Sequence, residues 1–160
     1  MTDRSNKIAP LIDPERIRLD ADLNSKKRAL EVLSELLADA QPNLTTEEIF
    51  ACLIRRERLG TTGVGHGIAI PHGRLQGLEK PVGAMLSLRH GVDFLANDEQ
   101  PVDLLFAMLV PEDANESHLE ILAALAEMFT DEQFTAKVRQ CGSVDDATQL
   151  LSSYQTDQAA

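Results

Sequence analysis

The apolar run VDLLFAMLV, from Val102 to Val110, constrains the fold more than any other part of the sequence. Its nearly continuous apolar character is typical of a strand that is buried on both faces of a sheet. Such a strand needs a covering layer on each side, and in layered domains these layers are helices. Two other apolar runs, bounded by Gly or Pro, predict neighbouring strands: GIAIP (Gly67 to Pro71) and VGAMLSL (Val82 to Leu88).

Helical patterns lie on both sides of these runs in the sequence. From Asn24 to Ala40, apolar residues recur at the spacing of a helix. Thr45 and Glu48 form the pattern of a capping box, so we expect a second helix that ends near Leu59. Three further helix starts follow, each a Ser or Thr with an acidic or amide residue three positions later: Ser117, Thr130 and Ser143. This order predicts a layered α/β domain in which helices flank a small mixed sheet.

A chain of 160 residues suits a single folded domain with an arm before it and a tail after it. We expect residues 1–23 to form an N-terminal arm that includes a short edge strand at Arg16 to Asp20. Residues 24–152 should form the folded domain, and residues 153–160 a tail that frays from about Tyr154. No internal repeat or low-complexity linker divides the chain.

The charge of the chain argues against nucleic-acid and membrane-surface binding. Its 26 acidic and 15 basic side chains give a formal charge of −11, which repels phosphate backbones and anionic lipids. No apolar stretch approaches the roughly 18 residues of a membrane span, and the N-terminus lacks a secretory signal. Cys52 and Cys141 lie far apart without a CxxC pair, which disfavours a disulfide or thiolate metal site. We therefore expect a cytoplasmic protein that does not insert into membranes.

The stretch RLGTTGVGHGIAIPHGR, residues 58 to 74, is rich in glycine but does not match a nucleotide-binding loop. The pattern GxxxxGK[ST] is absent, and Ile68 stands where GxGxxG needs its last glycine. The hydrolase and zinc-protease patterns GxSxG and HExxH are absent as well. We expect no cofactor, and what remains is the chemistry of histidine.

His72 has the most informative setting of the four histidines. Pro71 fixes its own φ and favours an extended Ile70, while Gly73 can adopt a positive φ. The imidazole is therefore predicted to stand on a turn at a strand end, where open α/β sheets bind ligands. A neutral imidazole nitrogen is a competent nucleophile near its usual pKa of about 6.5.

His118 and Arg56 can complete a phosphoryl site around His72. His118 follows the predicted cap at Ser117, in the first helical turn, where free N–H groups favour an anion. Arg56 lies near the end of the second predicted helix, and its planar fork suits phosphate oxygens. Taken singly, each residue is more often a capping or solvated side chain, so only their combination with His72 predicts a site.

The other two histidines have simpler interpretations. His90, in SLRHGV, is predicted to be a turn residue. His66 lies six positions before His72 and could be a second metal ligand, but no recognisable third ligand accompanies the pair. We therefore expect no metal.

RRERLGTTGVGHGIAIPHGR and GVDFLANDEQPVDLLFAMLVPEDANESHLEILAAL resemble the fructose/mannitol-type enzyme IIA domains of the bacterial phosphoenolpyruvate-dependent phosphotransferase system, and among them the nitrogen-regulatory type. The resemblance runs from about Asn24 to Leu151. It implies a small mixed sheet with helices on both sides and a site without metal or nucleotide. It also implies that His72 is the phosphorylated histidine, with His118 as the second active-site histidine and Arg56 beside them. His66 is not part of the family pattern.

The same resemblance implies a phosphoryl donor and two alternative roles. An HPr-like phosphocarrier, charged from phosphoenolpyruvate, would pass its phosphoryl group to Nε2 of His72. The protein would then act either as a regulator of partners such as transporters or sensor kinases, or as the enzyme IIA of a fructose/mannitol-type sugar uptake system. We favour regulation, because the sequence shows no fused transport segment and no second domain with a phosphorylatable cysteine.

Overall fold

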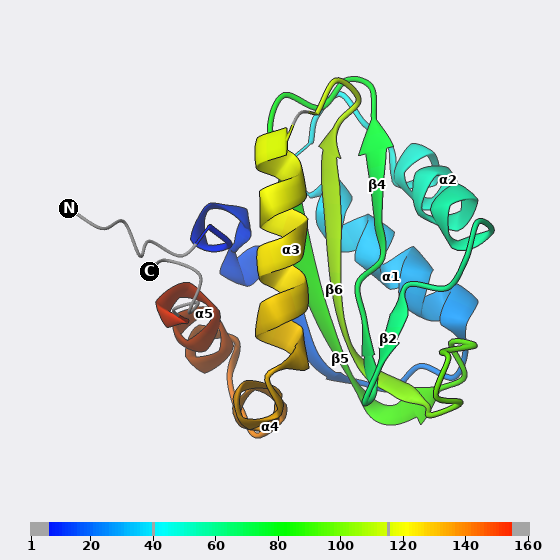
Figure 1. Cartoon of the computed structure of the whole chain (residues 1–160). Helices are drawn as coiled ribbons and strands as arrows, with labels where there is room; N and C mark the ends of the chain where they lie inside the picture. The colour runs from blue at the N-terminus through cyan, green and yellow to red at the C-terminus, as the bar shows by residue number, and fades with distance from the viewer. Residues whose placement is uncertain (1–6, 40, 115, 155–160) are drawn as a thin grey trace.

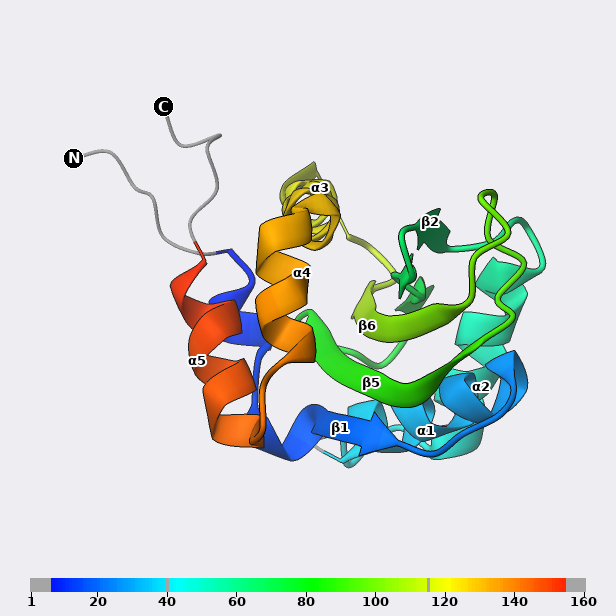
Figure 2. The ribbon, with the colours of Figure 1, turned by 90° about the horizontal axis from the view of Figure 1, so that it is seen from below.

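The computed structural model describes residues 7–39, 41–114 and 116–154, and for Glu116 and Ser117 it describes the backbone only. A mixed sheet runs through its centre, with helices on both faces (Figures 1 and 2). The strands are β1 (Ile17–Ala21), β2 (Gly63–Gly65), β3 (Ile68–Ala69), β4 (His72–Leu75), β5 (Val82–Val92) and β6 (Val102–Pro111). The helices are α1 (Lys26–Ala38), α2 (Thr46–Glu57), α3 (Glu116–Thr130), α4 (Glu132–Arg139) and α5 (Val144–Ser153), with 3₁₀ turns at Ala9–Leu11 and Pro14–Arg16.

β6 is the strand around which the sheet is built. It pairs antiparallel with β5 on one side, from Val82 opposite Leu109 to Val92 opposite Val102. On its other side it pairs parallel with both β3 and β4, which follow one another along the same edge. β1 extends the sheet by pairing parallel with β5, and β2 extends it by pairing antiparallel with β3. The mixed sheet predicted from the sequence is therefore confirmed.

The side chains of β6 alternate between two cores, one on each face of the sheet. Leu105, Ala107 and Leu109 pack with residues of α1 and α2. Leu104, Phe106, Met108 and Val110 pack with residues of α3, α4 and α5. Figure 2 shows the two helical layers on opposite sides of the sheet. The continuous apolar run in the sequence thus reflects burial on both faces, as expected.

The predicted helix starts are correct in part. The capping box of Thr45 and Glu48 is present in full, and Ser143 accepts from the N–H of Asp146 at the start of α5. Thr130 is not a cap: its hydroxyl donates back to the carbonyl of Ala126, and Asp131 caps α4 instead. α3 begins at Glu116, so Ser117 lies within its first turn, and the predicted capping side chain is outside the described residues.

Two predicted turns are strands in the structure. His90 lies within β5 and is exposed, because β5 continues to Val92 rather than ending near Leu88. His72 is the first residue of β4 rather than part of a turn. β2 and β4 are short and glycine-containing, which explains why apolar patterning did not reveal them.

The first and last of the described residues pack more closely against the domain than their sequence suggests. Ile8 and Leu11 are buried in the core on the α3 side, and the expected edge strand forms at Ile17–Ala21. Tyr154, where we expected fraying to begin, stacks edge-on with Phe134 at 4.6 Å between ring centroids. Residues 155–160 lie outside the described residues, and the division into arm, domain and tail stays a prediction.

Gly73 permits the close contact between β4 and α2. A Cβ at this position would lie 2.6 Å from Sγ of Cys52, a buried residue of α2. The Cys52 thiol in turn donates to the carbonyl of Arg74 at 3.3 Å. The expected positive φ is not found at Gly73, so the glycine is needed here for its small size.

We predict that Gly73→Ala lowers the free energy of unfolding by about 1–3 kcal/mol, because the added methyl group overpacks the contact with Cys52. Denaturant unfolding measures the loss. Cys52→Ala should relieve most of it in the double variant, while Gly142→Ala is the matched control because its Cβ would meet no atom within 4 Å. Equal losses with and without Cys52→Ala would show that the contact does not limit this position.

Candidate functional site

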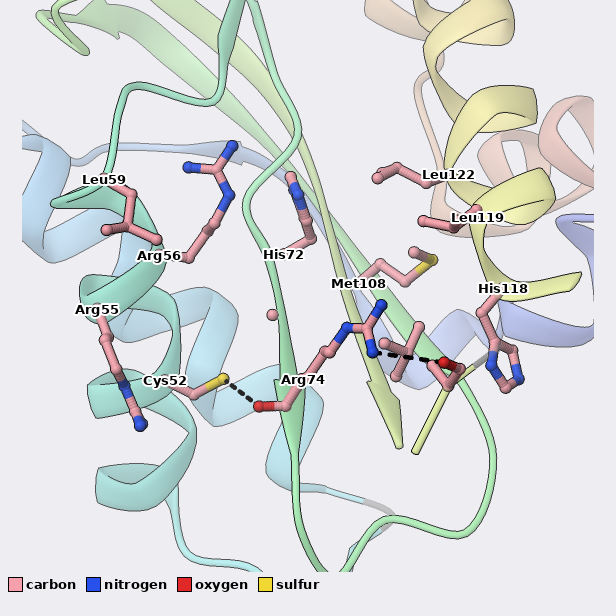
Figure 3. Close-up of a pocket in the computed structure, with 13 residues that line it drawn as sticks. Cys52, Arg55, Arg56, Leu59, His72, Arg74, Met108, His118, Leu119 and Leu122 are labelled. Carbon is pink, nitrogen blue, oxygen red and sulfur yellow. Dashed lines mark hydrogen bonds between the residues drawn. The ribbon is translucent and has the colours of Figure 1, made fainter. Parts of the chain in front are cut away.

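A pocket of about 380 Å³ opens between α2 and β4 on one side and the start of α3 on the other (Figure 3). Its wall contains the three residues that the sequence analysis placed in the site, His72, His118 and Arg56. It also contains Cys52, Arg55, Leu59, Gly73, Arg74, Met108, Val110, Ala114, Leu119 and Leu122. The structure therefore brings three segments that are distant in sequence to one concave surface.

A break in the sheet edge places His72 at this pocket. β3 ends at Ala69 and β4 begins at His72, and both pair with β6. Pro71 lies in the gap between them, where it lacks an N–H but its carbonyl accepts from the N–H of Met108 at 2.9 Å. The proline thus interrupts the strand while the edge stays attached to β6, and His72 lies beside the interruption.

The hydrogen bonding of His72 selects one tautomer of its ring. Nδ1 lies 2.7 Å from the carbonyl oxygen of Ile70, which can only accept, so Nδ1 carries the proton. In the neutral ring the lone pair is then on Nε2. Burial lowers the pKa of His72 below its ordinary value of 6.5, the positive charge of Arg56 lowers it further, and the Ile70 bond and Glu57 oppose this shift. At neutral pH His72 is therefore an uncharged ring with its free lone pair on Nε2.

Arg56 approaches His72 from the last turn of α2. Its Nη1 donates to the carbonyl of Gly60 at 2.8 Å, and Figure 3 shows its guanidinium beside the His72 ring. Gly60, with a φ of 154°, turns the chain after α2 in a conformation that favours glycine. Arg55, the preceding residue, is directed away from His72 in the same view. Of these two arginines, Arg56 is thus the one positioned to contact an anion on His72.

His118 lies on the opposite wall of the pocket, in the first turn of α3. It is half-buried, and its ring is turned away from His72 in Figure 3. The structure therefore places His118 in the predicted pocket but does not direct its ring at the predicted nucleophile.

Arg74 is a pocket residue that the sequence analysis did not identify. It follows His72 by two positions in β4, so both side chains lie on the same face of the strand. Figure 3 shows its guanidinium between β4 and the start of α3, where Nη1 donates to the carbonyl of Ala114 at 3.4 Å. The motif PHGR could have pointed to Arg74, but only if His72 were known to begin a strand, which places both side chains on one face.

The rim of the pocket is apolar and exposed. Leu59, after α2, is 83% exposed, and Leu119, in α3, is 56% exposed. Large exposed apolar side chains beside a functional pocket are typical of surfaces that dock another protein. The two leucines lie on opposite sides of His72 in Figure 3, so a docked protein could cover the histidine.

The described residues contain no group of three His, Cys, Asp or Glu side chains suited to a metal ion. His66 lies away from the pocket, between β2 and β3, with Nδ1 3.3 Å from Oε1 of Glu132. Within the same part of the chain, no helix combines the length and apolar character needed to cross a membrane.

We predict that NMR titration will give His72 a pKa below 6.5, because burial disfavours its charged form. Arg56→Gln should raise this pKa and Glu57→Gln should lower it further. Since the folded protein binds this proton less readily than the unfolded chain, stability should fall as the pH decreases from about 6.5 through the folded pKa. His72→Gln should lose this dependence, and an unchanged pKa in Arg56→Gln would show that the two groups do not interact.

Residues 10–154 match the family model described as "Phosphoenolpyruvate-dependent sugar phosphotransferase system, EIIA 2". A nitrogen regulatory protein of Pseudomonas aeruginosa is 40% identical over 152 residues, which cover 95% of this chain and 99% of the relative. The crystal structure of nitrogen regulatory protein IIA-Ntr from Neisseria meningitidis superposes with a TM-score of 0.85 at 38% identity, covering 90% of this chain and 98% of that one. The fructose-specific EIIA component of Haloferax volcanii is 36% identical over 145 residues, 91% of this chain and 92% of the relative. The chain therefore belongs to the EIIA 2 family of the phosphoenolpyruvate-dependent sugar phosphotransferase system, and its relatives over nearly the whole length include nitrogen regulatory proteins.

Proposed function

We propose that His72 accepts a phosphoryl group on Nε2 from an HPr-like phosphocarrier and that the phosphorylation state of the protein controls its partners. The observation that carries this proposal is the bond between Nδ1 of His72 and the carbonyl of Ile70. This bond leaves the Nε2 lone pair for attack, and the lowered pKa keeps it unprotonated at neutral pH. Membership of a phosphotransferase family supplies the reaction class.

The transfer needs no general base. The Nε2 lone pair attacks the phosphorus of a phosphohistidine on the donor protein, so that the Nε2–P bond forms as the donor N–P bond breaks. The electron pair of the broken bond returns to the donor nitrogen. The proton on Nδ1 stays on His72, held by the Ile70 carbonyl, and the donor ring keeps the proton on its other nitrogen. Positioning and charge stabilisation are then the main tasks of the protein.

Arg56 and His118 are proposed to stabilise the phosphoryl oxygens during transfer. Arg56 is already beside His72, and its guanidinium can exchange the Gly60 carbonyl for an anionic oxygen. His118 would contact the group after its ring turns toward His72. Because both residues act on charge that spreads over the oxygens in the transition state, their loss should affect the transfer rate more than the fold.

The docking partner would cover the apolar rim formed by Leu59 and Leu119. A phosphocarrier seated there would exclude water from the reacting atoms while the Arg56 guanidinium holds the phosphoryl group. A cytoplasmic location fits this role, since we propose exchange with a soluble carrier protein.

Regulation and sugar uptake remain the two candidate roles for the phosphorylated protein. The name of the Pseudomonas aeruginosa relative favours regulation, whereas the name of the Haloferax volcanii relative favours a fructose-specific uptake system. The Pseudomonas aeruginosa relative is 40% identical over 95% of this chain, against 36% over 91% for the Haloferax volcanii relative, so we favour control of partners such as transporters or sensor kinases.

We predict that phosphoenolpyruvate, enzyme I and an HPr-like carrier will add one phosphoryl group to the protein, acid-labile and base-stable as expected for a phosphoramidate. Mass spectrometry and labelling measure the modification. His72→Ala should abolish it, while Arg56→Ala and His118→Ala should slow it, with a loss on the order of a hundredfold for a donor to the developing charge.

Two outcomes would contradict these assignments. Full labelling of His72→Ala, with none in His118→Ala, would make His118 the acceptor. An unchanged rate in Arg56→Ala would remove Arg56 from the site. Circular dichroism of each variant controls for loss of the fold.

We predict that a regulated partner distinguishes the two forms of the protein, because phosphorylation adds roughly two negative charges to the docking surface. A partner that buries an unpaired dianion loses affinity, and a hundredfold difference would suffice for switching. Binding should be measured to the unphosphorylated protein, the phosphorylated protein and His72→Ala, which should behave as the unphosphorylated form. Equal affinities, together with rapid phosphoryl delivery to a sugar-permease component, would favour the uptake role instead.

A further inference from the structure

We propose that Arg74 binds the phosphoryl group on His72 and, by leaving the Ala114 carbonyl to do so, transmits phosphorylation to the start of α3. This inference rests on the proposed function, because it assumes that His72 becomes phosphorylated. It adds a second phosphoryl-binding arginine to the pocket and names the segment that responds.

The position of Arg74 follows from the register of β4. His72 pairs with Met108 and Arg74 pairs with Val110, so both residues are fixed against the same central strand. Their side chains share one face of β4, since alternate residues of a strand point the same way. Both line the pocket, and Figure 3 shows the Arg74 guanidinium on the α3 side of His72, opposite Arg56. A phosphoryl group on Nε2 would have the Arg56 guanidinium beside it, and the Arg74 guanidinium would reach it from the α3 side after leaving Ala114.

The charge of Arg74 is not engaged by a carboxylate among the described residues. The arginines that form ion pairs in that part of the chain are Arg16, Arg28, Arg89 and Arg139. Arg56 and Arg74, by contrast, each donate to a main-chain carbonyl at the pocket. The pocket is lined by three arginines, Arg55, Arg56 and Arg74, none of which forms an ion pair among the described residues. In a chain with a net charge of −11, this favours an anionic ligand there.

The present bond of Arg74 is weak enough to be exchanged. Its distance of 3.4 Å is at the long end of the range for hydrogen bonds, and its acceptor is a neutral carbonyl at an exposed site. A phosphoryl oxygen is charged and would accept a shorter bond of roughly twice the strength, with a geometry that suits the planar fork of arginine. Phosphorylation should therefore draw Arg74 away from Ala114.

Ala114 occupies the connection between β6 and α3. Its N–H donates to the carbonyl of Pro111, the last residue of β6, at 3.0 Å. Pro111 pairs with Leu75, the residue after Arg74, so the Arg74 bond closes a small loop of contacts between β4 and this turn. Releasing the Ala114 carbonyl changes this connection just before the helix that carries His118 and the exposed Leu119. One side of the docking rim would thus respond to phosphorylation.

The test uses the full chain phosphorylated by potassium phosphoramidate, which transfers a phosphoryl group to histidine without a protein donor. NMR then compares the phosphorylated and unphosphorylated forms of the wild type, Arg74→Gln, Arg74→Lys and the matched control Arg58→Gln. Arg58 is an exposed arginine just after α2 that does not line the pocket. The readouts are the carbonyl ¹³C shift of Ala114 and the amide shifts of Gly73 and Met108 beside His72.

We expect phosphorylation to shift Ala114 in the wild type and in Arg58→Gln but not in Arg74→Gln, whereas Gly73 and Met108 shift in all of them. Arg74→Lys keeps the charge without the planar fork and should show a reduced Ala114 shift. In the transfer reaction with an HPr-like carrier, Arg74→Gln should be slower by on the order of tenfold or more, a smaller loss than for Arg56→Ala.

An Ala114 shift that persists in Arg74→Gln, or one that is absent in the wild type, would overturn the inference while leaving the proposed function intact. If phosphoramidate modifies His72 but the carrier does not, the proposed donor is wrong and the Ala114 shift still decides the inference. If neither reagent modifies His72, both proposals are wrong.

Discussion

The pairing of β6 with the interrupted edge formed by β3 and β4 is the constraint on which the site depends. β6 is buried on both faces and paired on both sides, so it is a firmly held strand of the sheet. Pro71 breaks the edge strand, yet its carbonyl still accepts from Met108, so the break is fixed in place. The His72 ring is thus held at an irregular point of a rigid frame, which limits its freedom without burying it completely.

Much of the fold could be predicted from the sequence because its main features depend on apolar patterning. Four elements are long and strongly patterned: β5, β6, α1 and α2. The predicted bounds of β6, α1 and α2 lie close to the observed ones, whereas β5 continues beyond its predicted end at Leu88 to Val92. β4 was not predicted because its four residues, HGRL, carry no apolar alternation and pair only through the register of β6. The cap of α4 is predicted one residue too early because Thr130 and Asp131 are both good capping residues. The Thr130 hydroxyl instead donates to a carbonyl of α3, and Asp131 caps α4.

Some residues of the candidate site could be recognised from the neighbouring sequence, whereas others depend on contacts between distant segments. The tautomer-selecting bond of His72 joins residues two positions apart, and Arg56 precedes the glycine-rich stretch, so local sequence pointed to both. Arg74 depends on a strand that could not be predicted, and the orientation of His118 depends on how α3 packs against the sheet. Gly73 was assigned a conformational role, but its requirement comes from Cys52, a residue of another element. Contacts between distant segments explain each of these differences.

The bond that fixes the His72 tautomer has a consequence for how sequences of this kind can change. Its acceptor is the main-chain carbonyl of Ile70, an atom that every amino acid possesses. In sites where a carboxylate orients the histidine, one codon change can remove the acceptor and with it the tautomer. Here no substitution of a neighbouring side chain deletes that oxygen, and only a change in the path of the backbone could displace it. The tautomer of His72, and with it the proposed acceptor nitrogen, is therefore protected against point mutation by the path of the backbone itself.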